Sequence, residues 1–185
     1  QTCIAWGDPH TTTWNGEKHD FQGQMPTNKK RFYYVSPCAG YNYDDMPFSI
    51  IANHESYGGR QVSGIDYITL YLYEDSSQFY SVYVSASFFG YASNTDAAYD
   101  DSPPGYTSIT SNAGTQPFGT RFSLAYTKGT NSISGTLTID DTCTVSFNMY
   151  GQYYRVGTRW RMHRMEILPL DCYQCMACGL CGSYK

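Results

Sequence analysis

Short segments in which hydrophobic and polar residues alternate follow one another along most of the chain. The clearest segment is Tyr67–Glu74, where Ile68, Leu70 and Leu72 share one face and tyrosine and threonine the other. Phe79–Phe89 has the same period of two, which is typical of half-buried β-strands. Further strands are expected at Arg31–Val35, Phe48–Ala52, Tyr106–Thr110, Phe118–Lys128, Ile133–Ile139, Cys143–Tyr150 and Arg159–Leu168.

Turn-forming residues separate these segments, and helical periodicity is nearly absent. Lys128–Asn131 and Asp140-Asp141 predict hairpin turns, and the polar stretch Ala92–Gly105 predicts a loop. Many short strands at close spacing are typical of an antiparallel sandwich or barrel. We expect an all-β, antiparallel two-sheet β-sandwich with disulfide-linked N- and C-terminal ends, forming one domain over residues 1–185.

Composition narrows the class of protein. The 185 residues carry a net charge of -4, which argues against a nucleic-acid binder. No apolar run approaches the ~18 residues of a membrane span. The chain opens with Gln1 rather than Met, as expected of a processed form.

Seven cysteines occur, and four of them lie in the last fourteen residues. These four are Cys172, Cys175, Cys178 and Cys181. Their repeated C-x-x-C spacing fits a zinc site in an intracellular protein, whereas a secreted protein would form disulfides. The odd number leaves one cysteine free or paired with another chain.

Three motifs change the interpretation. Cys3 precedes Gly7-Asp8-Pro9-His10, Asp20-Phe21-Gln22-Gly23 follows, and Cys178-Gly179-Leu180-Cys181-Gly182 closes the chain. Together these motifs resemble the von Willebrand factor type D (VWD) family over Cys3 to Gly182. The resemblance implies a secreted, extracellular protein and two disulfides, Cys3–Cys181 and Cys38–Cys178. It therefore favours disulfides over zinc.

Three cysteines lie outside that implied pattern. Cys143 is expected to pair with Cys172 or Cys175, and the sequence does not choose between them.

The family usually has a cysteine where this chain has Met25, and that cysteine commonly pairs with a following module. We therefore expect a stand-alone D domain.

Calcium is a second property that the resemblance implies. Family members often bind Ca²⁺ through an aspartate at the position of Asn15 and an Asn/Asp-rich loop just after the final motif. Here only Ser183–Lys185 follow that motif. Since Ca²⁺ takes six to eight oxygen ligands, Asn15 alone predicts weak binding. Asp96, Asp100 and Asp101 form a weaker alternative site.

Some family members cleave themselves at the bond between Asp8 and Pro9. The aspartate carboxylate attacks its own carbonyl, and His10 could donate a proton to the leaving nitrogen. The alternative is that this motif is a structural turn, with proline fixing φ. We favour the structural turn.

The tyrosine side chains are the candidate binding residues. If the isoleucine and leucine face of the first strand is buried, Tyr67, Tyr71 and Tyr73 face outward together. Tyr83 and Phe89 on the neighbouring strand extend that patch. Exposed aromatic patches mark binding surfaces, although tyrosine is also a good β-former that fills both faces of a sandwich.

These observations predict a secreted, non-catalytic D-type module for extracellular assembly or binding. Its partner would be an extracellular protein or a second copy. One alternative is a carrier of a small hydrophobic ligand or pigment, and another is a luciferase-like oxidase. An oxidase would need a deep pocket that holds His54 or His163, and the histidines lie in no catalytic motif.

Overall fold

The computed structural model describes residues 1–7, 10–20, 30–56, 63–85, 88–96, 105–156 and 159–182. These residues form fifteen strands joined by turns and loops, and every pairing is antiparallel. The expected two-sheet antiparallel β-sandwich with disulfide-linked ends is confirmed. The described part of the chain contains no helix able to cross a membrane.

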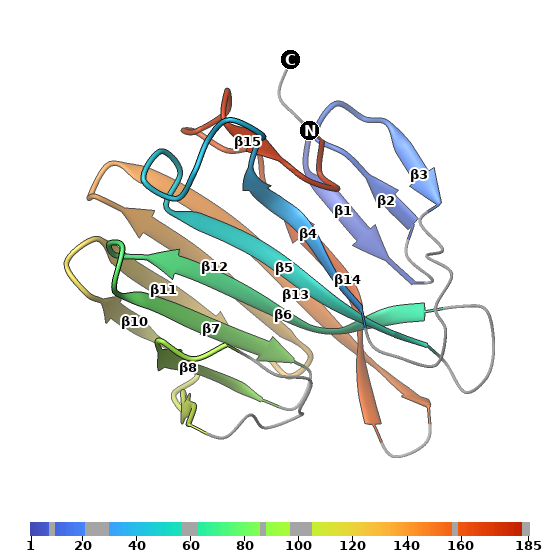
Figure 1. Ribbon diagram of the computed structural model, residues 1–185. Helices are drawn as coiled ribbons and strands as arrows, with labels where there is room; N and C mark the ends of the chain where they lie inside the picture. The colour runs from blue at the N-terminus through green and yellow to red at the C-terminus, as the bar shows by residue number, and fades with distance from the viewer. Residues whose placement is uncertain are drawn as a thin grey trace.

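Two layers make up the sandwich (Figure 1). The first layer runs in the order β10 (Ala113–Phe118), β11 (Phe122–Lys128), β12 (Ser132–Ile139), β13 (Cys143–Val156), β14 (Arg159–Ile167), β1 (Cys3–Trp6), β2 (His10–Thr12) and β3 (Lys18–Asp20). The second layer runs in the order β15 (Ala177–Cys178), β4 (Lys30–Pro37), β5 (Phe48–Ser56), β6 (Ser63–Tyr73), β7 (Phe79–Ser85), β8 (Phe89–Ser93) and β9 (Thr107–Ser108). The layers join where β14 pairs with β6.

Alternation along the strands decides which side chains enter the core. In β12, Leu137 and Ile139 are buried against the other layer, while Thr136 and Thr138 are partly exposed on the outer face. The buried face of β6 is apolar in the same way. Its core residues are the predicted Ile68, Leu70 and Leu72. The hydrophobic effect thus selects one face of each strand.

The C-terminal motif ties both layers together. Cys181 bonds to Cys3 in the first layer, and Cys178 bonds to Cys38 after β4 in the second. The backbone N–H groups of Leu180 and Cys181 also donate to the carbonyls of Tyr33 and Tyr34, at 3.0 and 3.1 Å. The motif therefore covers part of the edge of β4. The backbone N–H and C=O groups of that edge would otherwise be exposed.

The third disulfide joins Cys143 to Cys172 and leaves Cys175 unpaired and exposed. The structure thereby chooses between the two partners that the sequence left open. With Cys172, Cys178 and Cys181 all in disulfides, a zinc site built from the four C-terminal cysteines is wrong.

Candidate binding surface

The predicted aromatic patch lies on the outer face of the second layer, but most of it is buried. Tyr67, Tyr71 and Tyr83 are 1%, 5% and 0% exposed, so the prediction that they form an open surface is wrong. The rings of Tyr67 and Tyr83 stack with centroids 4.4 Å apart, and Phe88 and Tyr106 pack against them. The rings fill this layer themselves rather than forming open walls for a small hydrophobic ligand.

Residues that follow β8 cover part of this face. The Ser81 hydroxyl donates to the backbone oxygen of Thr95 at 2.6 Å and is hydrogen-bonded to the hydroxyl of Tyr106. Tyr106 in turn meets the ring of Tyr83 edge-on. Because these covering groups are distant in sequence from β6, alternation within β6 alone could not reveal them.

Arg31 of β4 covers the same face from the other side. Its Nη1 donates to Oδ2 of Asp96 at 2.9 Å, and its guanidinium carbon lies 5.5 Å from the centre of the Tyr71 ring. Burial lowers the pKa of Arg31, but the hydrogen bond and charge of Asp96 outweigh it and raise the pKa overall. Asp96, a candidate calcium ligand in the sequence, is thus an ion-pair partner.

Phe89 points into the core, which corrects its predicted place in the patch. The segment expected as one strand is a hairpin, in which Ser85 N–H donates to the carbonyl of Phe88 at 2.8 Å. After the turn, Phe89 pairs with Val84 and therefore shares its inward face. Phe89 is 3% exposed. The turn exchanges the faces that a continuous strand would have assigned.

Part of the outer face remains accessible near the β6–β7 turn. Tyr33 is 50% exposed, and Tyr43, Tyr73 and Phe79 are half-buried. The rings of Tyr43 and Tyr73 stack with centroids 3.6 Å apart, and Phe79 lies 6.0 Å from Tyr73. We call these four residues the tyrosine strip. Tyr73 is the one member that the sequence predicted.

Three elements position the tyrosine strip. Tyr73 and Phe79 are the last pair of the β6–β7 ladder, and Tyr33 comes from β4. The loop between β4 and β5 presents Tyr43, and the N–H of Tyr73 holds that loop by donating to the carbonyl of Pro47 at 2.8 Å. Burial, and then the hydrogen bond with Tyr43, raise the pKa of Tyr73, so its ring stays neutral at physiological pH.

Exposed carboxylates lie beside the strip. Asp44 and Asp45 are exposed in the loop that carries Tyr43, and Asp75 is exposed two residues after Tyr73. Hydrogen bonds from the backbone and hydroxyl of Ser77 lower the pKa of Asp75. The carboxylate of Asp75 is therefore charged at neutral pH.

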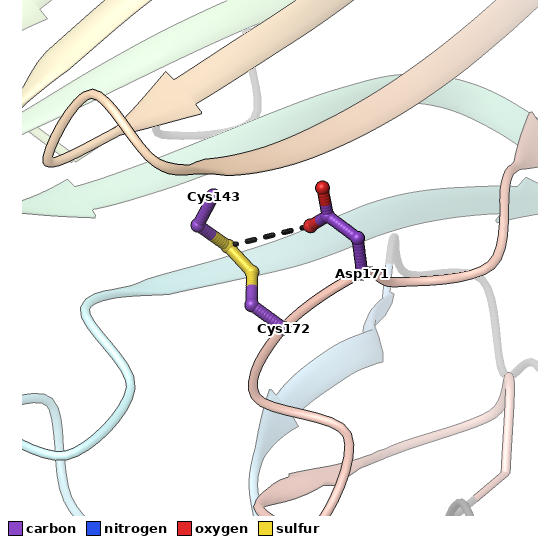
Figure 2. A group of neighbouring side chains, drawn as sticks. All are labelled: Cys143, Asp171 and Cys172. Atoms are coloured by element: carbon purple, nitrogen blue, oxygen red, sulfur yellow. Dashed lines mark hydrogen bonds between the residues drawn. A yellow bond between two sulfur atoms is a disulfide. The ribbon is translucent and has the colours of Figure 1, made fainter.

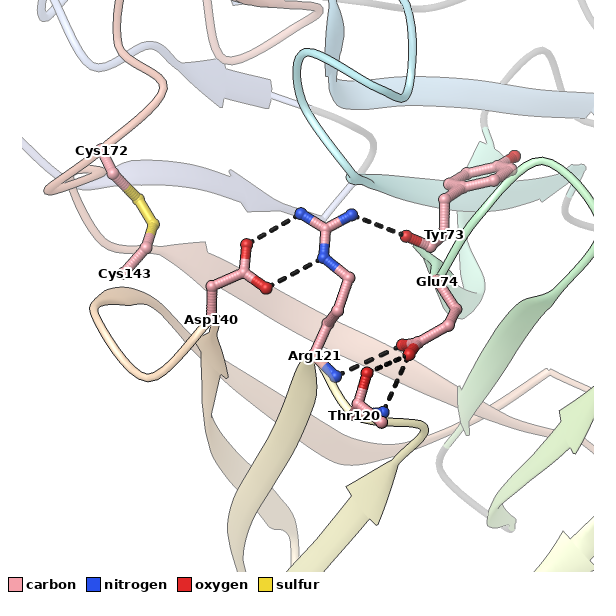
Figure 3. Close-up of polar contacts among 7 residues, drawn as sticks. All are labelled: Tyr73, Glu74, Thr120, Arg121, Asp140, Cys143 and Cys172. Atoms are coloured by element: carbon pink, nitrogen blue, oxygen red, sulfur yellow. Dashed lines mark hydrogen bonds and ion pairs between the residues drawn. A yellow bond between two sulfur atoms is a disulfide. The ribbon is translucent and has the colours of Figure 1, made fainter.

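Polar contacts connect the turns at this end of the sandwich (Figure 3). The carboxylate of Glu74 accepts from the N–H groups of Thr120 and Arg121 at 2.9 and 3.3 Å. Arg121 donates from Nε and Nη2 to the two carboxylate oxygens of Asp140 at 2.9 and 2.8 Å, and from Nη1 to the carbonyl of Tyr73 at 3.4 Å. The backbone beneath the strip is thereby linked to the opposite layer.

A second polar group at this end contains Cys143, Asp171 and Cys172 (Figure 2). Both sulfur atoms belong to one disulfide, so neither is a thiolate that could bind a metal. The Asp171 carboxylate instead accepts from the N–H and hydroxyl of Thr144 at 3.0 and 2.8 Å. This group is structural.

His54 is a buried histidine in the second layer. It is 0% exposed, with its Nε2 3.0 Å from the hydroxyl of Tyr34 and its ring 4.6 Å from that of Phe32. Burial lowers the pKa of His54 to about 4, so the ring is neutral at physiological pH. The side chain of His163 lies outside the described residues, and the oxidase hypothesis stays untested.

His10 forms a contact that the sequence did not indicate. Its Nδ1 lies 2.6 Å from Oδ1 of Asp20, directly across the β2–β3 ladder. Asp8 and Pro9 lie outside the described residues, so the predicted self-cleavage remains a prediction. The motif spacing suggested a role for His10 but gave no reason to pair it with Asp20.

Asn15 lies exposed in the turn after β2, close to the C-terminal motif. The N–H of the preceding Trp14 donates to the carbonyl of Cys181 at 3.0 Å. The nearby carboxylate of Glu17 lies 3.7 Å from His19. Ca²⁺ usually takes several carboxylate ligands, whereas this turn offers only the Asn15 amide and the Glu17 carboxylate. The residues described here therefore do not build the calcium site.

The sequence analysis did not place Tyr33 and Tyr43 in the aromatic patch, because they belong to other segments than Tyr73. Tyr33 and Tyr34 are adjacent in one strand and face opposite sides, and Tyr34 is buried. The sequence did contain a signal for Tyr43, because this tyrosine lies in the turn-rich segment 41–45 beside two aspartates.

Comparisons with known proteins find a partial relative. No protein-family model matches this chain. The chain is 34% identical to human IgGFc-binding protein over 74 residues, which are 40% of this chain. It spans about 1% of the length of that relative.

Proposed function

We propose that this chain is a secreted, non-catalytic VWD-like module that binds an extracellular protein through the tyrosine strip. The observation that carries the proposal is the strip itself. Tyr33, Tyr43, Tyr73 and Phe79 keep aromatic surface accessible, while Tyr67, Tyr71 and Tyr83 of the same face are buried. A group of accessible rings at one edge favours a contact with another molecule.

The disulfides support an extracellular location. Three bonds link the two layers and the chain ends, and such bonds persist in oxidising compartments. The sequence motifs that resemble the VWD family, and the partial similarity to IgGFc-binding protein, agree with this location. The name of that relative also supports a protein as the kind of partner.

Tyrosine suits such a contact. Its ring offers a large rigid area at a low cost in conformational entropy, and its hydroxyl remains hydrated or finds a partner. Tyrosine is accordingly enriched among the residues that dominate binding energy at protein interfaces. The link between the strip and the opposite layer through Arg121 holds the surface in place before binding.

Binding by a strip-deficient variant tests this proposal. Wild-type protein and the Tyr33→Ala/Tyr73→Ala variant are immobilised and exposed to extracellular fluid from the natural source, with purified human IgG Fc as a defined probe. Tyr150→Ala is the matched control, because Tyr150 is 37% exposed in β13 of the other layer. Retained proteins are identified by mass spectrometry and their affinities measured individually.

We expect the double variant to lose at least about tenfold in affinity for the retained partner, as removal of two interface tyrosines typically does. Tyr150→Ala should bind like wild type. Equal binding by all three proteins would contradict the proposal. Sedimentation of wild type as a dimer that Tyr33→Ala/Tyr73→Ala abolishes would identify the partner as a second copy.

A further inference from the structure

Five segments that meet at the end of the sandwich carrying the tyrosine strip are strongly acidic. They are residues 38–47, 74–78, 119–121, 140–142 and 168–176. They contain Asp44, Asp45, Glu74, Asp75, Asp140, Asp141 and Asp171, and their one basic residue is Arg121. We call this region the acidic end. With a net charge of -4 for the whole chain, negative charge is concentrated here.

Contacts between these segments place them together. The Tyr43–Tyr73 stack joins the first two, and Glu74 holds the third through the N–H of Thr120. The ion pair between Arg121 and Asp140, 2.8 Å long, adds the fourth. The disulfide Cys143–Cys172 adds the fifth, and Figure 3 shows the links made by Glu74, Arg121 and this disulfide in one view.

The carboxylates of the acidic end hold different groups. Glu74, Asp140 and Asp171 bind backbone or side-chain groups of neighbouring turns, while Asp45 and Asp75 accept from backbone N–H groups of their own turns. All of these carboxylates except Glu74 are on exposed residues. Three of them border the strip, since Asp44 and Asp45 follow Tyr43 in sequence and Asp75 lies two residues after Tyr73. A partner that contacts the strip therefore also meets negative charge.

The aromatic rings themselves favour cations. The face of a tyrosine ring attracts a guanidinium or ammonium group through its quadrupole. The protein already shows this contact on the same sheet face, since the Arg31 guanidinium lies over the Tyr71 ring at 5.5 Å. Planar guanidinium groups also suit carboxylates, because they present donors in a rigid fork.

From this combination we infer that the tyrosine strip and the acidic end together dock an arginine- and lysine-rich segment of a partner protein. The inference rests on the proposed function and specifies its partner class. Charge complementarity carries the choice of occupant: a second copy would bring its own acidic end against this one, and the like charges would repel. Asp44, Asp45 and Asp75 would repel an acidic partner and would offer a neutral one no charge–charge attraction.

Direct binding of a defined cationic probe tests the inference. A labelled peptide of eight arginines and a matched peptide of eight glutamates are titrated against the full chain in the presence of a chelator. The charge variant is Asp44→Asn/Asp75→Asn, which keeps an acceptor oxygen for the turn at Ser77. The control is Glu17→Gln/Asp20→Asn, which makes the same change in net charge at exposed residues around β3.

We expect the arginine peptide to bind and the glutamate peptide not to bind. The charge variant should weaken binding about tenfold at low salt, and raising salt should reduce the wild-type affinity toward that of the variant. Tyr73→Leu should weaken it a further ~2–5-fold, as expected for one exposed cation–π contact. Glu17→Gln/Asp20→Asn should stay within about twofold of wild type.

Two results would overturn the inference. One is equal weakening by the charge variant and its control, which would mean that the peptide senses only the net charge. The other is no binding of the arginine peptide at low salt. If that occurred while the strip variant still lost its extracellular partner, the binding-module proposal would stand and the cationic partner class would fail.

Discussion

Gly179 shows how the closure of this fold depends on a residue without a side chain. Its φ is +126°, and an added Cβ would lie 2.5 Å from the carbonyl oxygen of Tyr34. That approach lets the N–H groups of the next two residues reach β4. The glycine of the C-terminal motif is therefore required by geometry.

We predict that Gly179→Ala destabilises the protein by about 3 kcal/mol or more, since the backbone of β4 cannot move away. Gly40→Ala is the matched control, because Gly40 also has a positive φ, of +94°, but nothing within 4 Å of an added Cβ. It should cost about 1 kcal/mol. Denaturant titration measures both, and equal losses would contradict the steric argument.

His54 gives the protein a pH-dependent stability of defined sign. Its pKa is lowered to about 4 in the folded chain, while the unfolded chain titrates near the ordinary value of 6.5. Between these values the unfolded state binds more protons, so stability is full above about pH 6.5 and falls as the pH drops toward 4. The loss at the lower limit is about 3 kcal/mol.

We predict that His54→Gln flattens the decrease in unfolding free energy between pH 6.5 and 4. The measurement is chemical denaturation at several pH values, relative to wild type, because carboxylates also titrate in this window. An unchanged slope in His54→Gln would show that other groups cause the pH dependence.

At the scale of elements, the turn of the β12–β13 hairpin contains two aspartates that make different contacts. Asp140 and Asp141 have φ of +52° and +59°, as the central positions of a type I′ turn require, and Thr142 N–H closes the turn on Ile139 at 3.2 Å. The carboxylate of Asp140 also binds Arg121. Asp141 contributes no such contact to the link between the layers.

We predict opposite effects of glycine at these two positions. Asp141→Gly should stabilise the protein by about 0.5–1 kcal/mol, because glycine adopts positive φ without strain. Asp140→Gly gains the same relief but loses the paired hydrogen bonds with Arg121, so we expect a net loss of stability. Thermal unfolding of both variants tests this prediction. Equal stabilisation would mean that the ion pair between Asp140 and Arg121 contributes nothing to stability.

At the scale of the whole molecule, the disulfides differ mainly in the length of chain they close. Cys3–Cys181 joins residues 178 apart, whereas Cys143–Cys172 joins residues 29 apart. A longer closed loop removes more entropy from the unfolded chain. The bond between the chain ends is therefore expected to stabilise the fold more.

We predict that Cys3→Ala/Cys181→Ala lowers the unfolding free energy by about 1.5 kcal/mol more than Cys143→Ala/Cys172→Ala, from the loop-length dependence of chain entropy. Guanidinium denaturation of the two double variants tests this difference. Equal losses would indicate that local packing, and not loop closure, determines the contribution of each bond.

The sequence by itself determined the fold class and the inward faces of its long strands. Ile68, Leu70 and Leu72 alternate with polar or aromatic residues, and burial follows that alternation because the hydrophobic effect acts on one face of a strand. The motif resemblance also gave the two disulfides that close the molecule. Among the strands it missed, β1, β2, β3 and β15 have two to four residues each, too few alternating positions to be detected. It also missed β8 and β10, which have five and six residues.

Only the tertiary structure decided which tyrosines reach the surface. Tyr67 and Tyr83 are on the outer face as expected, yet Tyr106 packs over them from more than twenty residues away in sequence. The hairpin at Ser85 likewise turned Phe89 inward. The accessible strip combines rings from β4, a loop and the β6–β7 hairpin. Alternation is a property of one strand, whereas exposure depends on what other segments place on top of it.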